Sequence, residues 1–449
     1  MFSKNNIHFV GIGGSGMSGI AEVLINLGHN VSGSDLKKTE VTERLKSIGA
    51  KIFIGHSAKN VKNSDVVVTS TAVGKDNPEV LTALKKKIPV IPRVEMLAEL
   101  ARLKYSVTVA GTHGKTTTTS LAAMVLDEGG LNPTIVVGGR LKNLKSGARL
   151  GKGDYLVAEA DESDGSFLKL SPLITIVTNI DNDHLDYYGS MENLKEAFVK
   201  HINSVPFYGA AIICSDDALV KEIIPKIKRK YIAYGFNAKA DIRALNVKIG
   251  KNCTSYDVIY MGKKAGKVCI KAPGTHNILN SLAAAGAGLW LGVPFSSVAK
   301  AINSFDGVGR RLEIKGEKDK VLVIDDYGHH PTEVAATLSA IKNFWPKRKL
   351  KVLFQPHRYT RTQNLYKEFG KSFSCADIVS VLDIYPAGEK PLKGVSSELI
   401  IKSLQLNKTA VEKFKDLKSF SKDLTAGDIV LTLGAGDVWK KGEELLGGV

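Results

Sequence analysis

The stretch VTVAGTHGKTTTTSLAAM contains residue types that suit phosphate binding. A β-branched run precedes Gly111 and Gly114, and Lys115 and Thr116 open a run that favours a helix. Backbone N–H groups at such a helix start can surround an anion. Lys115 would reach the β- and γ-phosphates, and the Thr116 hydroxyl would bind Mg²⁺. The usual loop has another glycine where this chain has Val109, so the alternative is a tight turn with a solvent-exposed lysine.

Two acidic clusters follow the next two runs that we expect to be buried strands. The first, EADESD, starts at Glu159, and the second, IDNDHLD, contains His184. Carboxyl ends of parallel strands are where α/β sheets build their sites, and the phosphate loop comes at such an end as well. Mg²⁺ usually takes one or two carboxylates besides phosphate oxygens and water. The pattern predicts a carboxylate and an imidazole at a metal held by ATP phosphates, and the alternative is two solvated loops.

The segment GIGGSG, from Gly11 to Gly16, matches the G-x-G-x-x-G pattern between an expected strand and an expected helix. Asp35 follows at the end of the next strand. This arrangement is typical of a dinucleotide site in which the acid binds the ribose. The loop itself only cradles a diphosphate, which a UDP-sugar also carries. The pattern therefore fits NAD and a UDP-linked substrate.

Four further segments place polar side chains at helix starts or strand ends. GTHNILNSLAA sets Asn277 and Asn280 on neighbouring turns of one expected helix, where the simpler role is helix capping. GVGRRLE brings Arg310 and Arg311 to an expected domain joint. DDYGHHPTE and FQPHRYTRT follow consecutive strands and together hold acid, histidine and arginine. Arginine suits a carboxylate or phosphate partner because it can bond with two parallel hydrogen bonds.

Strand-like and helix-like segments alternate along the chain, which indicates βαβ units and parallel sheets. The alternation restarts twice, which predicts three α/β domains at residues 1–104, 105–309 and 310–449. Within the middle domain, residues 240–272 are expected to form antiparallel strands with glycine turns.

The composition is typical of a protein with a hydrophobic core, since 43% of the 449 residues are hydrophobic and 24% are charged. We find no run of 18 apolar residues and no cleavable leader, so we expect a cytoplasmic protein without a membrane span. The four cysteines fit no metal or redox spacing, and we expect reduced thiols. The net charge of +17 comes from dispersed lysines, which favours a basic surface or an anionic small substrate over nucleic acid.

Together these segments resemble the Mur ligase family of ATP-dependent enzymes that form amide bonds. The resemblance covers essentially the whole chain. Its most specific parts are, in chain order, AGTHGKTTTT, EADESDGSFL, TNIDNDHLDYY, PGTHNILNSLAA, GVGRRLE, DDYGHHPTE and FQPHRYTRT. The opening segment GIGGSGMSGIAEVL resembles that of the alanine-adding members and differs from that of the murein-peptide recycling ligases.

The resemblance implies a Rossmann-like N-terminal domain for a UDP-linked substrate, a central P-loop ATPase-like domain with a mostly parallel sheet for ATP, and a C-terminal Rossmann-like domain for the amino acid. The implied ATP contacts are Gly111, Thr112, His113, Gly114, Lys115, Thr116, Thr117, His276, Asn277, Asn280, Arg311 and Asp326. The implied substrate contacts are Gly11, Gly13, Gly14, Ser15, Gly16, Asp35, Ser70, Thr71, Tyr327, His329, His357, Arg358 and Arg361. The implied Mg²⁺ ligands are Thr116, Glu159 and His184, and the implied catalytic residues are Lys115, Glu159, His184, Arg311 and Asp326.

The implied reaction joins L-alanine to the lactyl carboxylate of UDP-N-acetylmuramate, for peptidoglycan synthesis. The carboxylate attacks the γ-phosphate of ATP to give ADP and an acyl phosphate, from which the amine of alanine displaces phosphate. Lys115 and Mg²⁺ would stabilise charge on the transferred phosphoryl group. We expect no nucleic-acid or membrane partner, and a monomer or a weak homodimer. A muropeptide-recycling ligase of the same family and a nicotinamide oxidoreductase are the alternatives.

Overall fold

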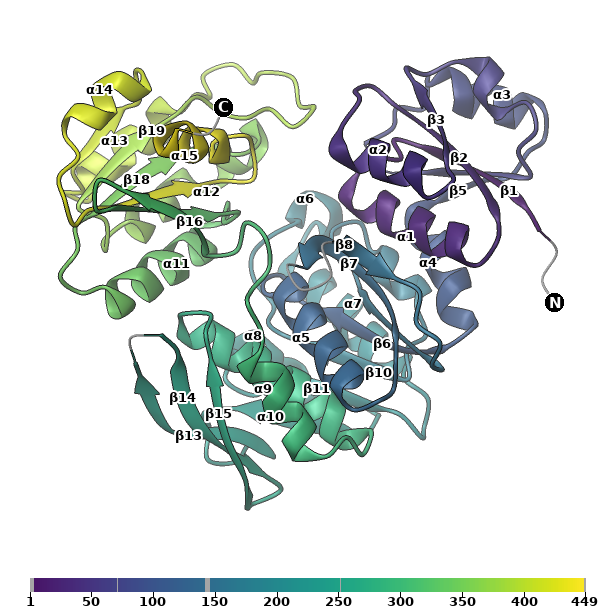
Figure 1. Cartoon of the computed structure of the whole chain (residues 1–449), viewed down its shortest axis with the longest axis horizontal. Coiled ribbons are helices and arrows are strands. Elements are labelled where there is room, and N and C mark those ends of the chain that lie inside the picture. The colour runs from purple at the N-terminus through teal and green to yellow at the C-terminus, as the bar shows by residue number, and fades with distance from the viewer. Residues whose placement is uncertain (1–3, 71, 142–145, 251, 448–449) are drawn as a thin grey trace. The chain divides into compact units, whose positions relative to one another are not determined.

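The computed structural model describes residues 4–70, 72–141, 146–250 and 252–447 and contains three β-sheets accompanied by helices (Figure 1). Apolar runs and glycine turns near the N-terminus form the first of these sheets. The chain forms two compact units. The first unit holds Met1–Val247, Ser255–Cys269 and Leu279–Asp306, and the second holds Lys248–Thr254, Ile270–Ile278 and Gly307–Val449. The domain limits at residues 104 and 309 stay predictions.

The N-terminal sheet is parallel, with the strand order β3-β2-β1-β4-β5 of a Rossmann half. Its strands are β1 Asn6–Val10, β2 Asn30–Asp35, β3 Lys51–Ile54, β4 Val66–Thr69 and β5 Val90–Pro92. Its helices are α1 Ser15–Asn26, α2 Glu40–Ser47, α3 Pro78–Lys85 and α4 Arg93–Arg102, with the 3-10 helix η1 Ala58–Val61. Because the strands run in one direction, the segments that follow β1, β2 and β3 lie at the same edge of the sheet.

The central sheet has the strand order β15-β14-β13-β12-β11-β10-β6-β9-β7-β8. Its strands are β6 Tyr105–Ala110, β7 Thr134–Leu141, β8 Ser146–Arg149, β9 Tyr155–Glu159, β10 Ile174–Val177, β11 Ala210–Cys214, β12 Tyr231–Gly235, β13 Ile242–Ile249, β14 Thr254–Tyr260 and β15 Lys263–Ile270. Strand β6 lies between β9 and β10 and pairs with both in parallel. The last three strands arise from the segment expected to be antiparallel, although β13 pairs in parallel with β12.

Helix α5 follows β6 directly and is buried over most of its length. The small residues Thr118, Ala122 and Ala123 have no exposed surface, and α5 packs against β7, β9 and α10. The helices that accompany the central sheet are α5 Lys115–Glu128, α6 Leu185–Tyr188, α7 Met191–Asn203, α8 Ala218–Ile223, α9 Thr275–Trp290 and α10 Phe295–Asn303, with η2 Ser166–Lys169 and η3 Ile224–Lys226. Close packing of α5 fixes the position of its first turn, where the phosphate loop ends.

The C-terminal sheet has the strand order β16-β17-β21-β18-β19-β20, and only the edge strand β16 is antiparallel to its neighbour. Its strands are β16 Glu313–Lys318, β17 Val321–Asp326, β18 Leu350–Phe354, β19 Ile378–Val381, β20 Val411–Lys413 and β21 Ile429–Leu433. Its helices are α11 Pro331–Phe344, α12 Tyr359–Ser372, α13 Glu398–Leu406, α14 Leu417–Lys422 and α15 Trp439–Leu446. Strands β17 and β18 both pair in parallel with β21, so the segments that follow them lie at one edge.

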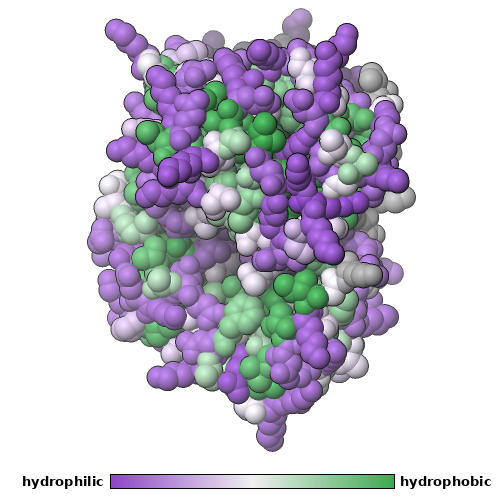
Figure 2. All heavy atoms as spheres, turned by 90° about the vertical axis from the view of Figure 1, so that its left-hand side faces the viewer, coloured by the Kyte–Doolittle hydropathy of each residue, from purple (hydrophilic) through white to green (hydrophobic). Residues whose placement is uncertain are grey.

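Hydrophilic side chains cover most of the face shown in Figure 2, with smaller hydrophobic areas between them. Among the described residues, no helix is both long and apolar enough to cross a membrane. Cys214 and Cys375 are free, whereas Cys253 and Cys269 are disulfide-bonded. The expectation of reduced thiols is therefore wrong for Cys253 and Cys269. Cys253 precedes β14 and Cys269 lies in the neighbouring strand β15, a relation that their spacing in the sequence does not reveal.

Candidate active site

The segment between β6 and α5 forms a turn that requires glycine at two positions. Gly111 has a φ of +131° and Gly114 a φ of +80°. A Cβ atom on Gly111 would lie 2.0 Å from Oγ1 of Thr178, and one on Gly114 would lie 2.7 Å from Oδ1 of Asn280. The glycines thus let the backbone pass close to both neighbours. Val109 belongs to β6, so the loop begins at Gly111 and is shorter than the usual motif.

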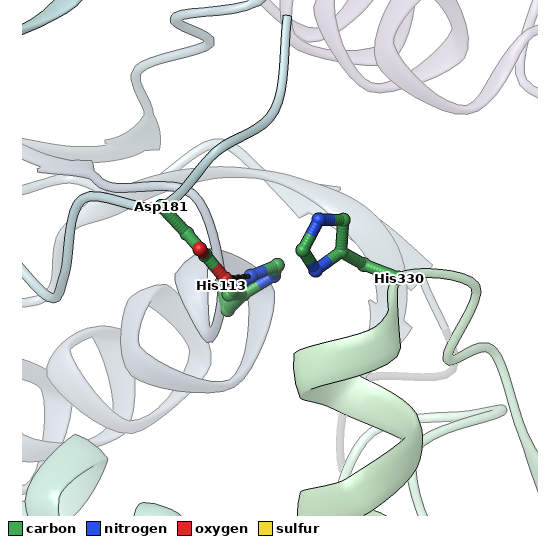
Figure 3. A group of neighbouring side chains, drawn as sticks. All are labelled: His113, Asp181 and His330. Carbon is green, nitrogen blue, oxygen red and sulfur yellow. Dashed lines mark hydrogen bonds and ion pairs between the residues drawn. The ribbon is translucent and has the colours of Figure 1, made fainter. Parts of the chain in front are cut away.

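Hydrogen bonds fasten this turn to the segment that follows β10. Asn179 Oδ1 accepts from the backbone N–H of His113 at 2.8 Å, and Asn179 Nδ2 donates to the His113 carbonyl at 3.0 Å. The backbone N–H of Asp181 donates to Thr112 Oγ1 at 2.9 Å. The His113 ring faces the Asp181 carboxylate, with Nε2 2.8 Å from Oδ2 (Figure 3). The loop therefore has a fixed backbone, as a phosphate cradle requires.

Lys115 is held inside the turn and is not a solvent-exposed lysine. Its Nζ donates to the carbonyls of Gly111 at 2.6 Å and Thr112 at 3.2 Å, and lies 2.8 Å from both carboxylate oxygens of Glu162. Burial lowers the pKa of Lys115, but the carboxylates of Glu162 and Asp161 outweigh burial and raise that pKa overall. Lys115 is therefore a permanent positive charge in the loop.

The buried side chain of Glu162 lies between Lys115 and His184. No role for Glu162 was predicted from the sequence. Its side chain is 1% exposed, and its Oε1 lies 3.8 Å from Nε2 of His184. The hydroxyl of Tyr188 donates to the Glu162 carbonyl at 2.5 Å. Burial raises the pKa of Glu162, and the ammonium of Lys115 opposes that rise. Glu162 thus links the phosphate loop to the segment that carries His184.

The three predicted metal ligands lie at or next to the ends of three different elements. Thr116 is the second residue of α5, and Glu159 ends β9, where its Oε1 accepts from the backbone N–H of Gly138 at 3.0 Å. His184 precedes α6 with a φ of +60°, and its Nε2 lies 3.6 Å from Oδ2 of Asp183. Hydroxyl and carboxylate oxygens are ligands that Mg²⁺ prefers. A Cβ atom on Gly138 would lie 2.9 Å from Glu159 Oε2, so glycine there leaves that oxygen room. The oxygens of Thr116 and Glu159 therefore fit Mg²⁺, whereas the imidazole of His184 is not a ligand type that Mg²⁺ prefers.

The N-terminal glycine loop is tied to Asp35. The backbone N–H of Gly13 donates to Asp35 Oδ2 at 2.9 Å, and a Cβ atom on Gly13 would lie 2.8 Å from that oxygen. A Cβ atom on Gly16 would lie 2.6 Å from Nη1 of Arg93. Arg93 also donates from Nη2 to Oδ2 of Asp161 at 3.2 Å, which connects α4 to the acidic segment after β9. The loop thus combines a close backbone approach with a carboxylate at the end of β2.

In the second unit, Asp326 ends β17 and is buried. Its carboxylate accepts from the backbone N–H groups of Leu312 at 2.7 Å and Gly328 at 2.8 Å. Burial raises the pKa of Asp326 to about 6, and the guanidinium of Arg311 opposes that rise. Arg311 donates from Nη1 to Oε1 of Glu333 at 3.3 Å. Asp326 therefore joins the backbone that follows Arg311 to the turn that follows β17.

Four of the predicted substrate residues lie together after β17 and β18. The ring centroid of His329 is 5.4 Å from that of Tyr327 and 5.6 Å from that of His357. Nη1 of Arg361 lies 3.4 Å from Nδ1 of His357. Burial lowers the pKa of His329 to about 4 and that of His357 to about 3, so both rings are neutral at pH 7. Arg358 directly precedes α12 and has a φ of +71°.

The start of α9 carries three predicted ATP contacts with different surroundings. Asn280 Oδ1 accepts from Oγ1 of Thr118 at 3.1 Å, which places Asn280 beside the phosphate loop. Asn277 Nδ2 donates to the carbonyl of Pro273 at 2.7 Å, which stabilises the helix start. Burial lowers the pKa of His276 to about 4. The geometry thus brings Asn280 to the loop and gives Asn277 a local contact.

Sequence reasoning missed Glu162, Arg93 and Asn179. Glu162 and Asn179 lie within the quoted motifs, but only the chain path shows which of several acidic or amide residues turns toward the loop. Arg93 stands in no motif. Of the other predicted residues, Ser70 follows β4 and is half-buried, Thr71 lies outside the described residues, and the side chain of Ser15 does too.

Three family models match the chain in sequence. They are the Mur ligase family catalytic domain at residues 6–105, the Mur ligase middle domain at residues 109–288 and the Mur ligase glutamate ligase domain at residues 310–436.

Named relatives match nearly the whole chain. A UDP-N-acetylmuramate–L-alanine ligase of Endomicrobium trichonymphae is 72% identical, and 99% of each chain is covered. A protein of the same name from Trichlorobacter lovleyi is 54% identical, and 98% of each chain is covered. The crystal structure of a UDP-N-acetylmuramate–alanine ligase from Thermotoga maritima is 31% identical, has a TM-score of 0.84, and is matched over 98% of its length by 99% of this chain. The three-domain α/β fold is confirmed, and the chain belongs to the Mur ligase family.

Proposed function

We propose that the protein joins L-alanine to the lactyl carboxylate of UDP-N-acetylmuramate, with conversion of ATP to ADP and phosphate, in the cytoplasmic stage of peptidoglycan synthesis. The 72% identity to a UDP-N-acetylmuramate–L-alanine ligase over 99% of both chains supports this substrate pair. A nicotinamide oxidoreductase would leave the GKT turn and its carboxylates without use, so the G-x-G-x-x-G loop is assigned to a UDP diphosphate.

ATP binds with its phosphates in the turn between β6 and α5. Lys115 supports this assignment, since its charge is held between loop carbonyls and the buried Glu162 carboxylate. The γ-phosphate of ATP competes with the Glu162 carboxylate for Nζ of Lys115. The ammonium group therefore exchanges one anionic partner for the other when ATP binds. Asn280, beside the loop, supplies an amide for the nucleotide. Thr116, Glu159 and His184 hold Mg²⁺, which neutralises phosphate charge when it is bound.

The remaining two sites hold the other reactants. The Gly11–Gly16 loop and Asp35 bind the UDP part, because the loop backbone can approach a diphosphate and Asp35 stands at the end of the next strand. Tyr327, His329, His357 and the adjoining arginines bind at the amino-acid end. An arginine suits the carboxylate of alanine because its guanidinium can donate two parallel hydrogen bonds.

The chemistry proceeds in two steps with balanced atoms. A lactyl carboxylate oxygen forms a bond to the γ-phosphorus, and the bond between that phosphorus and the β–γ bridging oxygen breaks, which releases ADP. The amine of alanine then attacks the acyl carbon, phosphate leaves with the bridging oxygen, and the nitrogen loses a proton. Lys115 stabilises the phosphoryl oxygens while charge shifts between the oxygens that attack and leave.

Coupled assays of ADP and phosphate release test the proposal. Purified protein with Mg²⁺ and ATP receives UDP-N-acetylmuramate, and L-alanine is then added or omitted. We expect release of ADP only with both acceptor and amino acid, in equal amount to the amide product. Turnover with a free muropeptide in place of L-alanine, and none with L-alanine, would instead identify a recycling ligase.

A further inference from the structure

A buried carboxylate in the N-terminal domain lies outside the site described above. Glu79, near the start of α3, has a side chain with no exposed surface. Its Oε2 accepts from Oγ of Ser34 at 2.5 Å, and its Oε1 accepts from Nδ2 of Asn60 at 2.5 Å. The ring of His8 lies close as well, with Nε2 3.7 Å from Oε1. Burial raises the pKa of Glu79, but these neighbours outweigh burial and lower it to about 2, so the group is a carboxylate at neutral pH.

The imidazole of His56 completes this group. Its Nδ1 lies 3.1 Å from Oε2 of Glu79 and 2.9 Å from Oγ of Ser34. The single hydroxyl proton of Ser34 is donated to Glu79, so both oxygens that face Nδ1 are acceptors. The neutral ring therefore carries its proton on Nδ1, and Nε2 is left as a hydrogen-bond acceptor.

His56 lies at the edge of the N-terminal sheet where the strands end and where the glycine loop and Asp35 are also found. His56 follows β3 by two residues, and the backbone N–H of Gly55 donates to the carbonyl of Asp35 at 2.8 Å. Its side chain is 19% exposed, and no hydrogen bond to Nε2 is present among the described residues. Leu36, which directly follows β2, and Ile54, which ends β3, are 71% and 57% exposed. A free acceptor beside uncovered apolar side chains suits the edge of a flat heterocycle.

The order of the strands places this corner at the far end of a bound nucleotide. The glycine loop follows β1, Asp35 ends β2, and His56 follows β3, and these strands are neighbours in that order. With the diphosphate at the loop and the ribose at Asp35, the base extends toward the end of β3. Uracil carries one N–H donor on its pairing edge, at N3, whereas cytosine has an acceptor at that atom.

We infer that Nε2 of His56 accepts a hydrogen bond from N3–H of the uracil ring, and that Glu79 is a positioning residue that fixes the ring tautomer needed for it. The inference rests on the proposed function and adds how the base is recognised. Asn60 and Ser34 hold the Glu79 carboxylate, so a buried acid determines which nitrogen of the partly exposed His56 ring carries the proton.

Calorimetric titration of the full chain with UDP, CDP and N3-methyl-UDP tests the inference. One net hydrogen bond corresponds to an affinity difference of about threefold to tenfold. We expect wild-type protein to bind UDP more tightly than both analogues by at least this factor. His56→Ala should lower the affinity for UDP and bring the ratio of the affinity for UDP to the affinity for CDP close to one. His29→Ala is the matched control, because His29 precedes β2 at the opposite edge of the same sheet, and it should leave the ratio unchanged.

The Glu79→Gln variant tests whether Glu79 sets the tautomer of the His56 ring or only stabilises the local structure. A glutamine amide can face Nδ1 with its NH₂ group, which moves the ring proton to Nε2 and turns that atom into a donor. We expect the UDP-to-CDP ratio to fall as it does in His56→Ala, and long-range ¹H–¹⁵N spectra to show a changed tautomer for the ring whose signals His56→Ala removes. ATP affinity should stay at the wild-type value in both variants.

Two results overturn the inference. One is an equal loss of affinity for UDP, CDP and N3-methyl-UDP in His56→Ala, which makes His56 a structural residue. The other is a wild-type protein that binds UDP and CDP alike. Either result can occur in an active ligase, so the proposed function survives it. A protein that binds no UDP and does not ligate alanine refutes the proposed function instead.

Discussion

Lys115 and Glu162 form a buried ion pair in the turn between β6 and α5, and this pair changes what a lysine substitution tests. From the sequence, removal of the Lys115 amine would be expected to abolish ligation and leave the fold intact. The structure shows that such a variant leaves the Glu162 carboxylate, which is 1% exposed, without its ammonium partner. Removing one member of a buried pair usually costs more stability than replacing both members with apolar residues.

The Lys115→Met variant should therefore unfold more easily as well as lose ligase activity. We expect a loss of about 3 kcal/mol in the free energy of unfolding, measured by urea denaturation followed by circular dichroism. The double variant Lys115→Met with Glu162→Leu should regain most of that stability and stay inactive. As a control, Lys169→Met breaks an exposed pair with Glu95 and should cost less than about 1 kcal/mol. A single variant as stable as wild type would contradict the buried pair.

Asp326 gives the second unit a pH-dependent stability with a definite sign. Burial raises its pKa to about 6, whereas the unfolded chain titrates near 3.8. Between these pH values the folded state binds more protons, so the free energy of unfolding falls as pH rises, by about 3 kcal/mol in total. Asp326→Asn should remove this fall, seen as a flatter dependence of the urea midpoint on pH between 4 and 6. An unchanged slope would show that Asp326 ionises normally.

At the scale of elements, the phosphate loop connects β6 to α5 and is hydrogen-bonded to the segment that follows β10. The Asn179 side chain, just after β10, bonds both backbone groups of His113, and Nζ of Lys115 donates to the Gly111 carbonyl. The loop backbone tolerates little change in position, because α5 is buried along most of its length and cannot shift away from the loop. A side chain added at Gly111 must therefore displace Thr178, the residue that follows β10.

Gly111→Ala tests this loop. The new Cβ atom would lie 2.0 Å from Thr178 Oγ1, at a φ of +131° that alanine rarely adopts. We expect at least about a tenfold rise in the KM for ATP, together with a clear loss of stability. Gly130→Ala is the matched control: Gly130 also has a positive φ, but nothing lies within 4 Å of the added atom. It should cost about 1 kcal/mol of stability and leave the KM for ATP unchanged. Equal effects from both substitutions would mean that backbone strain alone, rather than the Thr178 contact, governs the loop.

At the scale of the whole molecule, the sequence predicted the α/β class and the order of its glycine loops because each signal is local. A buried parallel strand appears as a short apolar run, and a glycine turn before a helix marks a phosphate site without knowledge of the fold. Local signals also placed Lys115, Asn280 and Asp326 in polar sites.

Features that depend on how distant segments meet could not be predicted in this way. Glu162 is one of four acidic residues within six positions, and only the path of the chain after β9 turns it toward Lys115. Arg93 meets Gly16 and Asp161 across elements far apart in sequence. The acceptor role of Nε2 in His56 follows from a hydrogen-bond network contributed by β2, η1 and α3, which no spacing reveals.

The most direct test of the central claim is the fate of the lactyl oxygens during turnover. UDP-N-acetylmuramate labelled with ¹⁸O in both carboxylate oxygens is incubated with the protein, ATP, Mg²⁺ and L-alanine, and the released phosphate is analysed by mass spectrometry. An acyl-phosphate ligase transfers one labelled oxygen to each phosphate and keeps the other in the amide product. Phosphate free of ¹⁸O, released while the amide forms, would contradict carboxylate attack on the γ-phosphate.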